Sequence, residues 1–284
     1  MKKFLSFVIL SVLVLALAAC GTAKEDKKEK SDDKETASGE TTKLVVGASN
    51  TPHAVILEKA KPILAEEGID LEIEEYQDYV LPNQDLETGD LDANFFQHIP
   101  YLDQEIKDKG YDFVNAGSIH IEPIGIYSQE YKSLDKLPDG ATIIISNSVS
   151  DQGRILSLLE KEGIIKLKEG IDKTAATLDD IVENPKKLEI DASSAPEMLV
   201  QYYKNGEGDA VVINSNFAID AGIKPLEDSI AIEGSDSPYV NIVTVRSEDK
   251  DNEAIKKLVE VLRSKEIQDF ILEEWDGAVV PVTK

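Results

Sequence analysis

From residue 43 onward, segments with the hydrophobic pattern of a strand alternate with segments that have the hydrophobic spacing of a helix. This alternation is the feature that most limits how the chain can fold. Residues 44–48 form a short apolar run typical of a strand, residues 52–67 carry apolar side chains at helical spacing, and residues 71–76 alternate as a second strand. Strands and helices that follow one another in this way are typical of α/β proteins. The chain is long enough for one large domain or for two lobes.

The same patterns continue to the C-terminus. Further strands are predicted at residues 119–127, 142–146, 209–213 and 240–245, and further helices at 154–161, 195–204, 253–263 and 267–274. Gly163, Gly206 and Gly277 stand where helices are expected to end, because glycine readily adopts the left-handed conformation that closes a helix.

Two segments resemble each other in pattern and favour a two-lobed arrangement. Residues 88–96 and 206–214 each contain a glycine turn, an Asp-Ala pair and a predicted strand that leads into aromatic or polar residues. Ligands of open α/β sheets bind beyond the carboxyl ends of the strands, so two facing lobes would place Phe96 and Asn214 across one cleft. Coincidence is the competing explanation, since Gly-Asp and Asp-Ala pairs are common.

The first twenty residues predict secretion. Lys2 and Lys3 precede an apolar run over residues 4–19, which is shorter than the roughly 20 residues that span a bilayer comfortably. A short membrane anchor is therefore the less favoured interpretation. The Leu-Ala-Ala-Cys-Gly sequence at residues 17–21 resembles the bacterial lipobox, in which the cysteine is diacylated, for example with palmitate, after cleavage before it. We predict a signal peptide over residues 1–19 and lipidation of Cys20.

The composition changes abruptly after Cys20. Residues 22–42 are rich in Lys, Asp, Glu and Ser and contain no aromatic or branched aliphatic side chain, so they cannot contribute to a core. We expect residues 20–42 to form a lipid-bearing, flexible charged tether that spans on the order of 25 Å. A solvated helix of alternating charges is the alternative.

The charge and residue counts exclude several classes of function. With 30 Lys and Arg against 55 Asp and Glu, the formal net charge is -25, which disfavours binding to nucleic acid. One cysteine and three histidines leave little for a transition-metal site, and we expect neither a metal nor a cofactor. The sequence contains no nucleotide-binding Gly-x-x-x-x-Gly-Lys loop, no Gly-x-Ser-x-Gly elbow and no His-Glu-x-x-His motif, so an enzyme is not expected.

Residues 94–102 concentrate aromatic side chains. They hold two of the seven phenylalanines, one of the three histidines and a tyrosine. Aromatic faces suit an apolar or thioether side chain, because a polarisable sulfur gains roughly 0.3–1.5 kcal/mol against a ring. The segment therefore predicts a recognition surface, with core packing as the alternative.

Residues 146–154 lead from a predicted strand into a helix expected to begin near Asp151. Backbone donors at a helix N-terminus favour an anion, and Arg154 adds a two-pronged donor. A cation is electrostatically unfavourable at this end of a helix, which indicates that something negative lies beside it. Pairing with Asp151 or Glu160 is the alternative to a ligand carboxylate.

Three asparagines stand at predicted strand ends, namely Asn214, Asn216 and Asn241. An amide can accept from an ammonium group and donate to a carboxylate. Turn capping is the competing use of asparagine at such positions.

Together, these segments resemble the NlpA/MetQ family of bacterial lipoproteins, the substrate-binding subunits of methionine ABC importers. The block Phe-Gln-His-Ile-Pro-Tyr at residues 96–101 is the most specific marker. The other markers, in the same order along the chain, are residues 51–53, 78–83, 89–95, 152–154, 213–218, 238–242 and 276–281.

The resemblance implies a two-lobed α/β fold of the type II periplasmic-binding-protein kind, with the ligand cleft between the lobes. We expect residues 43–128 and 239–284 to form lobe 1 and residues 129–238 to form lobe 2. The partners implied are methionine, a separate permease and a separate ATPase, with the protein itself a monomer anchored at the extracytoplasmic face of the cell membrane.

The resemblance also assigns roles to single residues. It places the ligand thioether among aromatic residues, the ligand carboxylate at an arginine, and the amino and carboxylate groups at two asparagines. The corresponding residues here are Tyr79, Phe96, His98 and Tyr101, then Arg154, and then Asn214 and Asn241.

Three other functions remain open on the sequence. A binding protein of the same build could take a methionine-containing dipeptide or another amino acid, and Ser-Asn-Ser at residues 146–148 departs from the Pro-Asn-Asp of many relatives. An extracellular hydrolase could use His98 with a nearby carboxylate. A surface adhesin would bind no small molecule.

Overall fold

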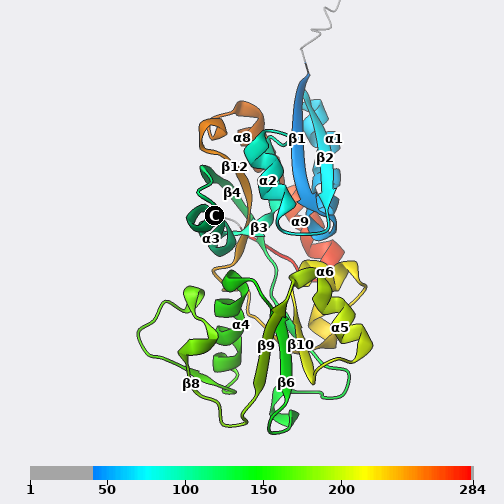
Figure 1. The fold of residues 1–284 in the computed structure, drawn as a ribbon. Helices are drawn as coiled ribbons and strands as arrows, with labels where there is room; N and C mark the ends of the chain where they lie inside the picture. The colour runs from blue at the N-terminus through cyan, green and yellow to red at the C-terminus, as the bar shows by residue number, and fades with distance from the viewer. Residues whose placement is uncertain (1–40, 283–284) are drawn as a thin grey trace, which may run out of the picture. The chain divides into compact units, whose positions relative to one another are not determined.

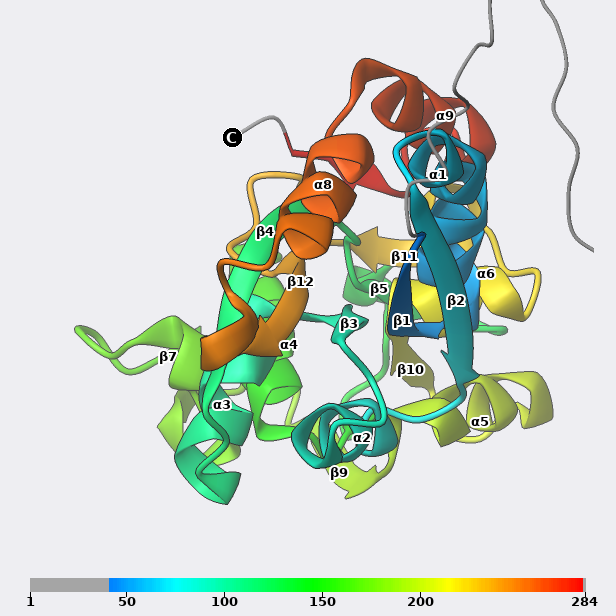
Figure 2. The same ribbon diagram turned by 90° about the horizontal axis from the view of Figure 1, so that it is seen from above.

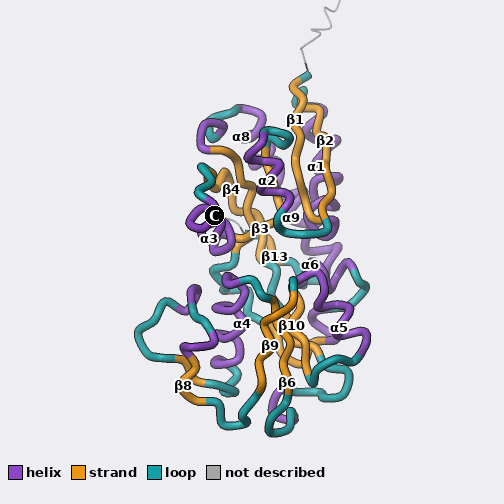
Figure 3. The backbone as a smooth tube through the Cα atoms, in the orientation of Figure 1, coloured by secondary structure: helices purple, strands orange, loops and turns teal. Residues whose placement is uncertain are grey.

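The computed structural model describes residues 41–282, and the predicted signal peptide, Cys20 and all but the end of the predicted tether lie outside this range. Two main β-sheets organise the described chain (Figures 1 and 3). The first has six strands, in the order β13 (Val280–Pro281), β4 (Phe113–Ile121), β12 (Val240–Arg246), β3 (Ala93–His98), β1 (Thr42–Ser49) and β2 (Ile69–Tyr76). We call this sheet with its helices the first lobe.

The second lobe is built on a five-stranded sheet. Its order is β11 (Ser229–Ile232), β5 (Gly125–Tyr127), β10 (Ala210–Ile213), β6 (Thr142–Ser146) and β9 (Glu189–Ser194). A two-stranded ribbon, β7 (Lys166–Leu167) with β8 (Ile181–Glu183), is separate from this sheet. The short turns are η1 (Asn50–Ala54), η2 (Leu134–Lys136), η3 (Lys173–Ala175), η4 (Leu178–Asp180), η5 (Pro196–Met198) and η6 (Ser247–Asp249).

Helices cover both faces of each sheet. On the first, α1 (Val55–Glu66), α8 (Glu253–Leu262) and α9 (Lys265–Trp275) lie on one side, and α2 (Leu81–Thr88) and α3 (Ile99–Lys109) on the other (Figure 2). On the second, α4 (Val149–Lys161) packs on one face, and α5 (Leu199–Asn205) and α6 (Ser215–Asp220) pack on the other. The short α7 (Pro225–Asp228) follows. This arrangement confirms the predicted two-lobed α/β class.

The predicted elements are largely present, with shifted ends. The helix expected to begin near Asp151 begins at Val149, and the one expected from residue 52 begins at Val55, after the η1 turn. Gly206 ends α5 with a φ of 69°, in the left-handed region where a side chain would be strained. Among the described helices, none has both the length and the apolar character to cross a membrane.

The strand predicted at residues 119–127 is wrong in one respect, since it is two strands in different sheets. β4 ends at Ile121, and β5 begins at Gly125 on the second sheet. Pro123 lies in the gap and has no N–H to continue a strand ladder. By sheet membership the chain thus leaves the first lobe before β5, a few residues earlier than the expected boundary at 128. The lobe bounds as a whole stay a prediction.

The two similar segments of the sequence have the same hydrogen bonds. Asp92 accepts from the backbone N–H of Val45 at 2.7 Å through its carboxylate, and its own N–H donates to the Val45 carbonyl at 2.9 Å. Asp209 makes the same pair of bonds with Thr142, again at 2.7 and 2.9 Å. Each aspartate thereby fixes the start of a strand, β3 or β10, beside its parallel neighbour, β1 or β6. We call these two pairs the aspartate latches.

Candidate functional site

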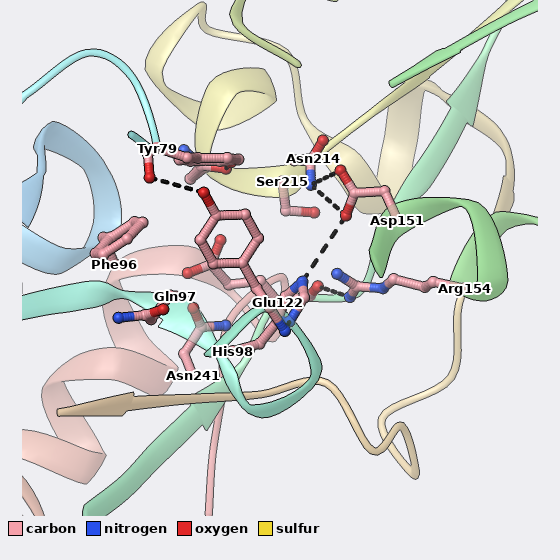
Figure 4. Close-up of a pocket in the computed structure, with 12 residues that line it drawn as sticks. Tyr79, Phe96, Gln97, His98, Glu122, Asp151, Arg154, Asn214, Ser215 and Asn241 are labelled. Carbon is pink, nitrogen blue, oxygen red and sulfur yellow. Dashed lines mark hydrogen bonds and ion pairs between the residues drawn. The ribbon is translucent and has the colours of Figure 1, made fainter. Parts of the chain in front are cut away.

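All seven side chains that the family resemblance assigns to the ligand line one pocket (Figure 4). The pocket contains about 400 Å³ of space free of protein atoms, part of it open to solvent. The first lobe contributes Tyr79, Phe96, His98, Tyr101 and Asn241, and the second contributes Arg154 and Asn214. The structure thus brings together Phe96 and Asn214 from the ends of β3 and β10, while their part in ligand binding stays a prediction.

Three rings form one side of the pocket, which we call the aromatic wall: Tyr79, Phe96 and Tyr101. Their centroids lie 6.0–6.2 Å apart in tilted or edge-on arrangements, as aromatic side chains prefer. The Tyr101 hydroxyl donates to the Tyr79 carbonyl at 2.9 Å, which fixes the two rings together. Burial raises the pKa of both tyrosines, so both stay neutral phenols and the wall carries no charge.

His98 stands between the aromatic wall and the charged part of the pocket. It caps α3, and its Nδ1 accepts the backbone N–H of Tyr101 at 3.1 Å. The ring proton of a neutral His98 therefore lies on Nε2, which is 3.8 Å from Asp151 Oδ1 across the two lobes. Contacts within the protein therefore orient both ring nitrogens of His98, Nδ1 toward the Tyr101 N–H and Nε2 toward Asp151.

Arg154 is buried and held largely by the protein itself. Its Nε donates to Glu233 Oε2 at 2.7 Å, Nη2 lies 2.5 Å from the same oxygen and also donates to the Glu122 carbonyl, and Tyr239 stacks 4.8 Å away. The anion expected beside this helix-terminal arginine is thus Glu233, from the loop after β11, and neither Asp151 nor Glu160. Within residues 41–282, Nη1 has no partner, which leaves one prong of the guanidinium for a ligand.

Asp151 and Asn214 form a second polar group in the pocket, in addition to Arg154. Asn214 Nδ2 donates to both oxygens of Asp151 at 3.3 Å, while its Oδ1 is buried without a partner among the described residues. Burial alone would raise the pKa of Asp151, but hydrogen bonds and charges from His98 and Arg154 hold it below the ordinary value. Asp151 is therefore a carboxylate at neutral pH, and the free Asn214 oxygen is available to accept from a ligand.

Sequence reasoning did not find Glu122. It follows β4 directly, is 5% exposed and lines the pocket. Burial raises the pKa of its carboxyl, and His53, Arg154 and His98 act against that rise. A signal was available, because Glu122 is the single acidic residue in the largely apolar stretch 119–127, two positions after His120. The other lining residues are Gln97, Asp151 and Ser215, together with Asn216, which the sequence indicated as a strand-end amide but which the family resemblance did not assign to the ligand.

Three side chains beside the pocket have the chemistry of metal ligands. His53, His120 and Glu122 offer atoms that lie within 4.8 Å of one another. Histidine ligands of metals almost always donate their second ring N–H to an acceptor, yet in the described residues neither Nδ1 atom has a partner. The group therefore fits a hydrogen-bonded network better than a metal site.

The pocket lies between two α/β lobes that contact each other directly. The Tyr79 hydroxyl donates to Asn216 Oδ1 at 2.6 Å, and the Ser215 hydroxyl donates to the Pro123 carbonyl. A pocket between the strand ends of two α/β lobes, joined by short connections, defines the class of two-lobed substrate-binding proteins, which close around a ligand.

Comparison with known proteins gives the family. The chain belongs to the NlpA lipoprotein family, whose model matches residues 44–283. It is 46% identical, over the full length of both chains, to a Bacillus subtilis protein named methionine-binding lipoprotein MetQ.

Solved structures are similar in fold and sequence. A pheromone cOB1 precursor and lipoprotein of the YaeC family from Enterococcus faecalis is 57% identical with a TM-score of 0.83, and the match covers 85% of this chain and 100% of that one. A nutrient-binding protein from Burkholderia cenocepacia, bound to methionine, is 42% identical with a TM-score of 0.80, covering 84% and 99%.

Proposed function

We propose that this chain is the extracytoplasmic substrate-binding subunit of an ABC importer and that it captures methionine. The observation that carries the proposal is the pocket itself, in which an uncharged aromatic wall stands opposite a buried charged group. The names of the relative from Bacillus subtilis and of the methionine-bound structure from Burkholderia cenocepacia support the choice of ligand.

The aromatic wall is suited to the thioether side chain of methionine. A sulfur that lies about 5 Å from ring edges gains favourable contacts, and Phe96 and Tyr101 present their rings edge to face at 6.0 Å. The wall supplies no strong hydrogen-bond donor of its own, because the Tyr79 and Tyr101 hydroxyls already donate to the protein. An apolar side chain is therefore preferred there to a polar one.

The charged part of the pocket is suited to the amino and carboxylate groups. Three carboxylates, of Glu122, Asp151 and Glu233, surround the single guanidinium of Arg154. The excess of negative charge favours a ligand with an ammonium group, for which Glu122, Asp151 and the free Asn214 oxygen are acceptors. We assign the ligand carboxylate to Arg154 Nη1 and to the Asn241 amide nitrogen.

The hydrolase alternative is weakened by the same contacts. The candidate base, His98, uses Nδ1 to accept a backbone N–H and directs Nε2 toward Asp151. The candidate nucleophile in the pocket is the Ser215 hydroxyl, and it already donates to the Pro123 carbonyl. We therefore infer that the protein binds and releases its ligand without chemical change.

Mass spectrometry of the small molecules released when the purified protein is denatured tests the proposal directly. Methionine should be recovered unmodified, and added L-methionine should bind saturably in calorimetry. Recovery of a methionine-containing dipeptide, of D-methionine or of another amino acid would redirect the assignment of the ligand. A chemically altered product would favour the hydrolase, and the absence of saturable binding would favour an adhesin.

We further propose that Cys20 carries the lipid, that the protein acts as a monomer, and that the permease and the ATPase are separate chains. The Leu-Ala-Ala-Cys-Gly sequence supports the anchor. Replacing Cys20 with Ala should abolish incorporation of labelled palmitate and release the protein from the cell membrane. Continued membrane attachment of that variant would disprove the anchor.

A further inference from the structure

Two buried histidines that the pocket does not expose both contact its carboxylate Glu122. His120 on β4 places Nε2 2.7 Å from Glu122 Oε1, and His53 in the η1 turn places Nε2 3.2 Å from the same oxygen. His53 Nε2 also lies 3.1 Å from Asn241 Oδ1. Both rings are at most 1% exposed, so neither reaches a ligand, whereas Glu122 lines the pocket.

The surroundings of the two rings define their tautomers. Each Nδ1 lacks a hydrogen-bond partner among the described residues, and the Phe95 ring packs 4.7 Å from His53 and 5.3 Å from His120. Burial lowers the pKa of His53 to about 4 and that of His120 to about 3, so both rings are neutral at physiological pH. An ionised carboxylate only accepts hydrogen bonds, so His120 carries its proton on Nε2 and donates it to Glu122. The His53 ring also carries its proton on Nε2, where it donates to Asn241 Oδ1 while lying 3.2 Å from the Glu122 oxygen.

We propose that His120 and His53 are positioning residues: His120 donates to one oxygen of Glu122 from behind, His53 packs its N–H edge against the same oxygen while bonded to Asn241, and together they present this carboxylate, ionised, to the ammonium group of the ligand. The inference rests on the proposed function, since it assumes an amino acid in the pocket. Neutral rings suit this task, because the His120 hydrogen bond and the nearby N–H of His53 stabilise the charge of Glu122 without neutralising it as a salt-bridge partner would.

Few other groups act on Glu122. From α4 the charge of Arg154, from the end of β3 His98, and from α6 the backbone N–H of Asn216 favour its ionised form, against the burial that raises its pKa. Loss of a histidine donor should therefore raise the pKa of Glu122 further and weaken ligands that need its charge.

Two ligands and two matched substitutions separate positioning from general structural support. His120→Met removes the donor at similar volume, whereas His120→Gln keeps an N–H near the position of Nε2. Affinity is measured by calorimetry between pH 5 and 9 for methionine and for its 2-hydroxy analogue, which lacks the ammonium group.

We expect His120→Met to weaken methionine binding by about tenfold or more at pH 7, as for a lost hydrogen bond to a charged group. The loss should diminish as the pH rises, the hydroxy analogue should be affected little, and His120→Gln should recover most of the affinity. Equal losses for both ligands, or no difference between the Met and Gln variants, would overturn the inference.

Measurements on the unmodified protein test the inference without relying on the folding of a variant. The ring nitrogen chemical shifts of His53 and His120 should report the Nε2–H tautomer, and elemental analysis should find no stoichiometric metal. The Nδ1–H tautomer, or a bound metal, would contradict it. Failure of the unmodified protein to bind methionine would instead refute the proposed function, so the two failures are distinguishable.

Discussion

The two lobes share one local plan but present different chemistry to the pocket. In the first sheet β3 and β2 flank β1 in parallel and β12 is antiparallel to β3, and in the second β10 and β9 flank β6 in parallel and β5 is antiparallel to β10. An aspartate latch begins β3 and another begins β10. The frame therefore does not determine the chemistry, which depends on the residues at the strand ends and helix entries.

The two lobes differ in the residues that they carry at equivalent strand ends and helix entries. β3 carries Phe96 and His98 in its last residues, whereas β10 is followed by Asn214. The entry to α1 carries neutral His53, whereas α4 carries the ionised Asp151 and Arg154 in its first turns. The first lobe thus supplies the aromatic wall, and the second lobe supplies most of the charge. The comparison explains how one amino acid can be held at its side chain by one lobe and at its polar groups by the other.

The largest effect is expected when the charged part of the second lobe is broken. Arg154→Ala should cost about 2–5 kcal/mol of methionine binding, as for one partner removed from a buried charge pair. Glu233 then remains without its guanidinium. Arg263→Ala, in the first lobe, removes a guanidinium that bonds the Ser118 carbonyl and serves as the control. Unchanged calorimetric affinity of Arg154→Ala would refute its role.

The aromatic wall of the first lobe should respond to a different ligand property. Phe96→Ala should weaken methionine by about 1–3 kcal/mol, the value of one apolar side chain buried against a ring, and should affect alanine binding much less. Titration of both amino acids into both proteins gives the comparison. Equal losses for methionine and alanine would mean that the wall only packs the core.

Acid should affect the two lobes at different pH. His53 is neutral in the native state down to about pH 4 but titrates near 6.5 when unfolded, so the unfolded state binds more protons and stability falls as the pH drops from about 6.5 to 4. The lowered pKa of Asp151 gives stability that is present above about pH 4 and lost below it. The raised pKa of Glu122 acts in the opposite direction to His53 and makes the first phase shallower.

Urea unfolding at a series of pH values, on the unmodified protein and on His53→Gln and Asp151→Asn, checks this prediction. The His53 variant should reduce the fall in stability above pH 4 by on the order of 1–3 kcal/mol, and the part due to His120, whose pKa is also lowered, should remain. The Asp151 variant should flatten only the phase below pH 4. A single acid transition that neither substitution changes would contradict the assignment.

The smallest effect tests the shared plan itself. Asp92→Ala and Asp209→Ala should each lower the free energy of unfolding by about 1–2 kcal/mol, because each leaves the backbone N–H of Val45 in β1 or of Thr142 in β6 without its charged acceptor. Asn at either position should recover part of the loss, since its carbonyl oxygen still accepts. A loss at one site only would show that the two latches are not equivalent.

Much of the fold was predictable because it follows from local patterns. The helix over residues 253–263 and the strands around 142–146 and 240–245 were recognised from their hydrophobic periods, which do not depend on tertiary contacts. The prediction of one strand at 119–127 is wrong because a buried apolar run has the same sequence pattern whether it stays in one sheet or passes from one sheet to another. Pro123 was the local signal of that break.

The site was predictable in its residue types and less so in its contacts. The aromatic block and Arg154 were found from their density and position, and Tyr79 came only from the family resemblance. Glu233, the actual partner of Arg154, lies 79 residues along the chain, and no local pattern links the two. Glu122 was missed because a single acidic residue has no periodicity to reveal it.

The sequence alone determined the α/β class, the candidate residues and the family, because hydrophobic period and specific residue blocks are local properties of the chain. Only the tertiary structure decided which charges meet. Arg154 is committed largely to Glu233, and two histidines far apart in the sequence converge on Glu122. Burial and distance set the charge of such groups, and both arise only when the two sheets and their connections are in place.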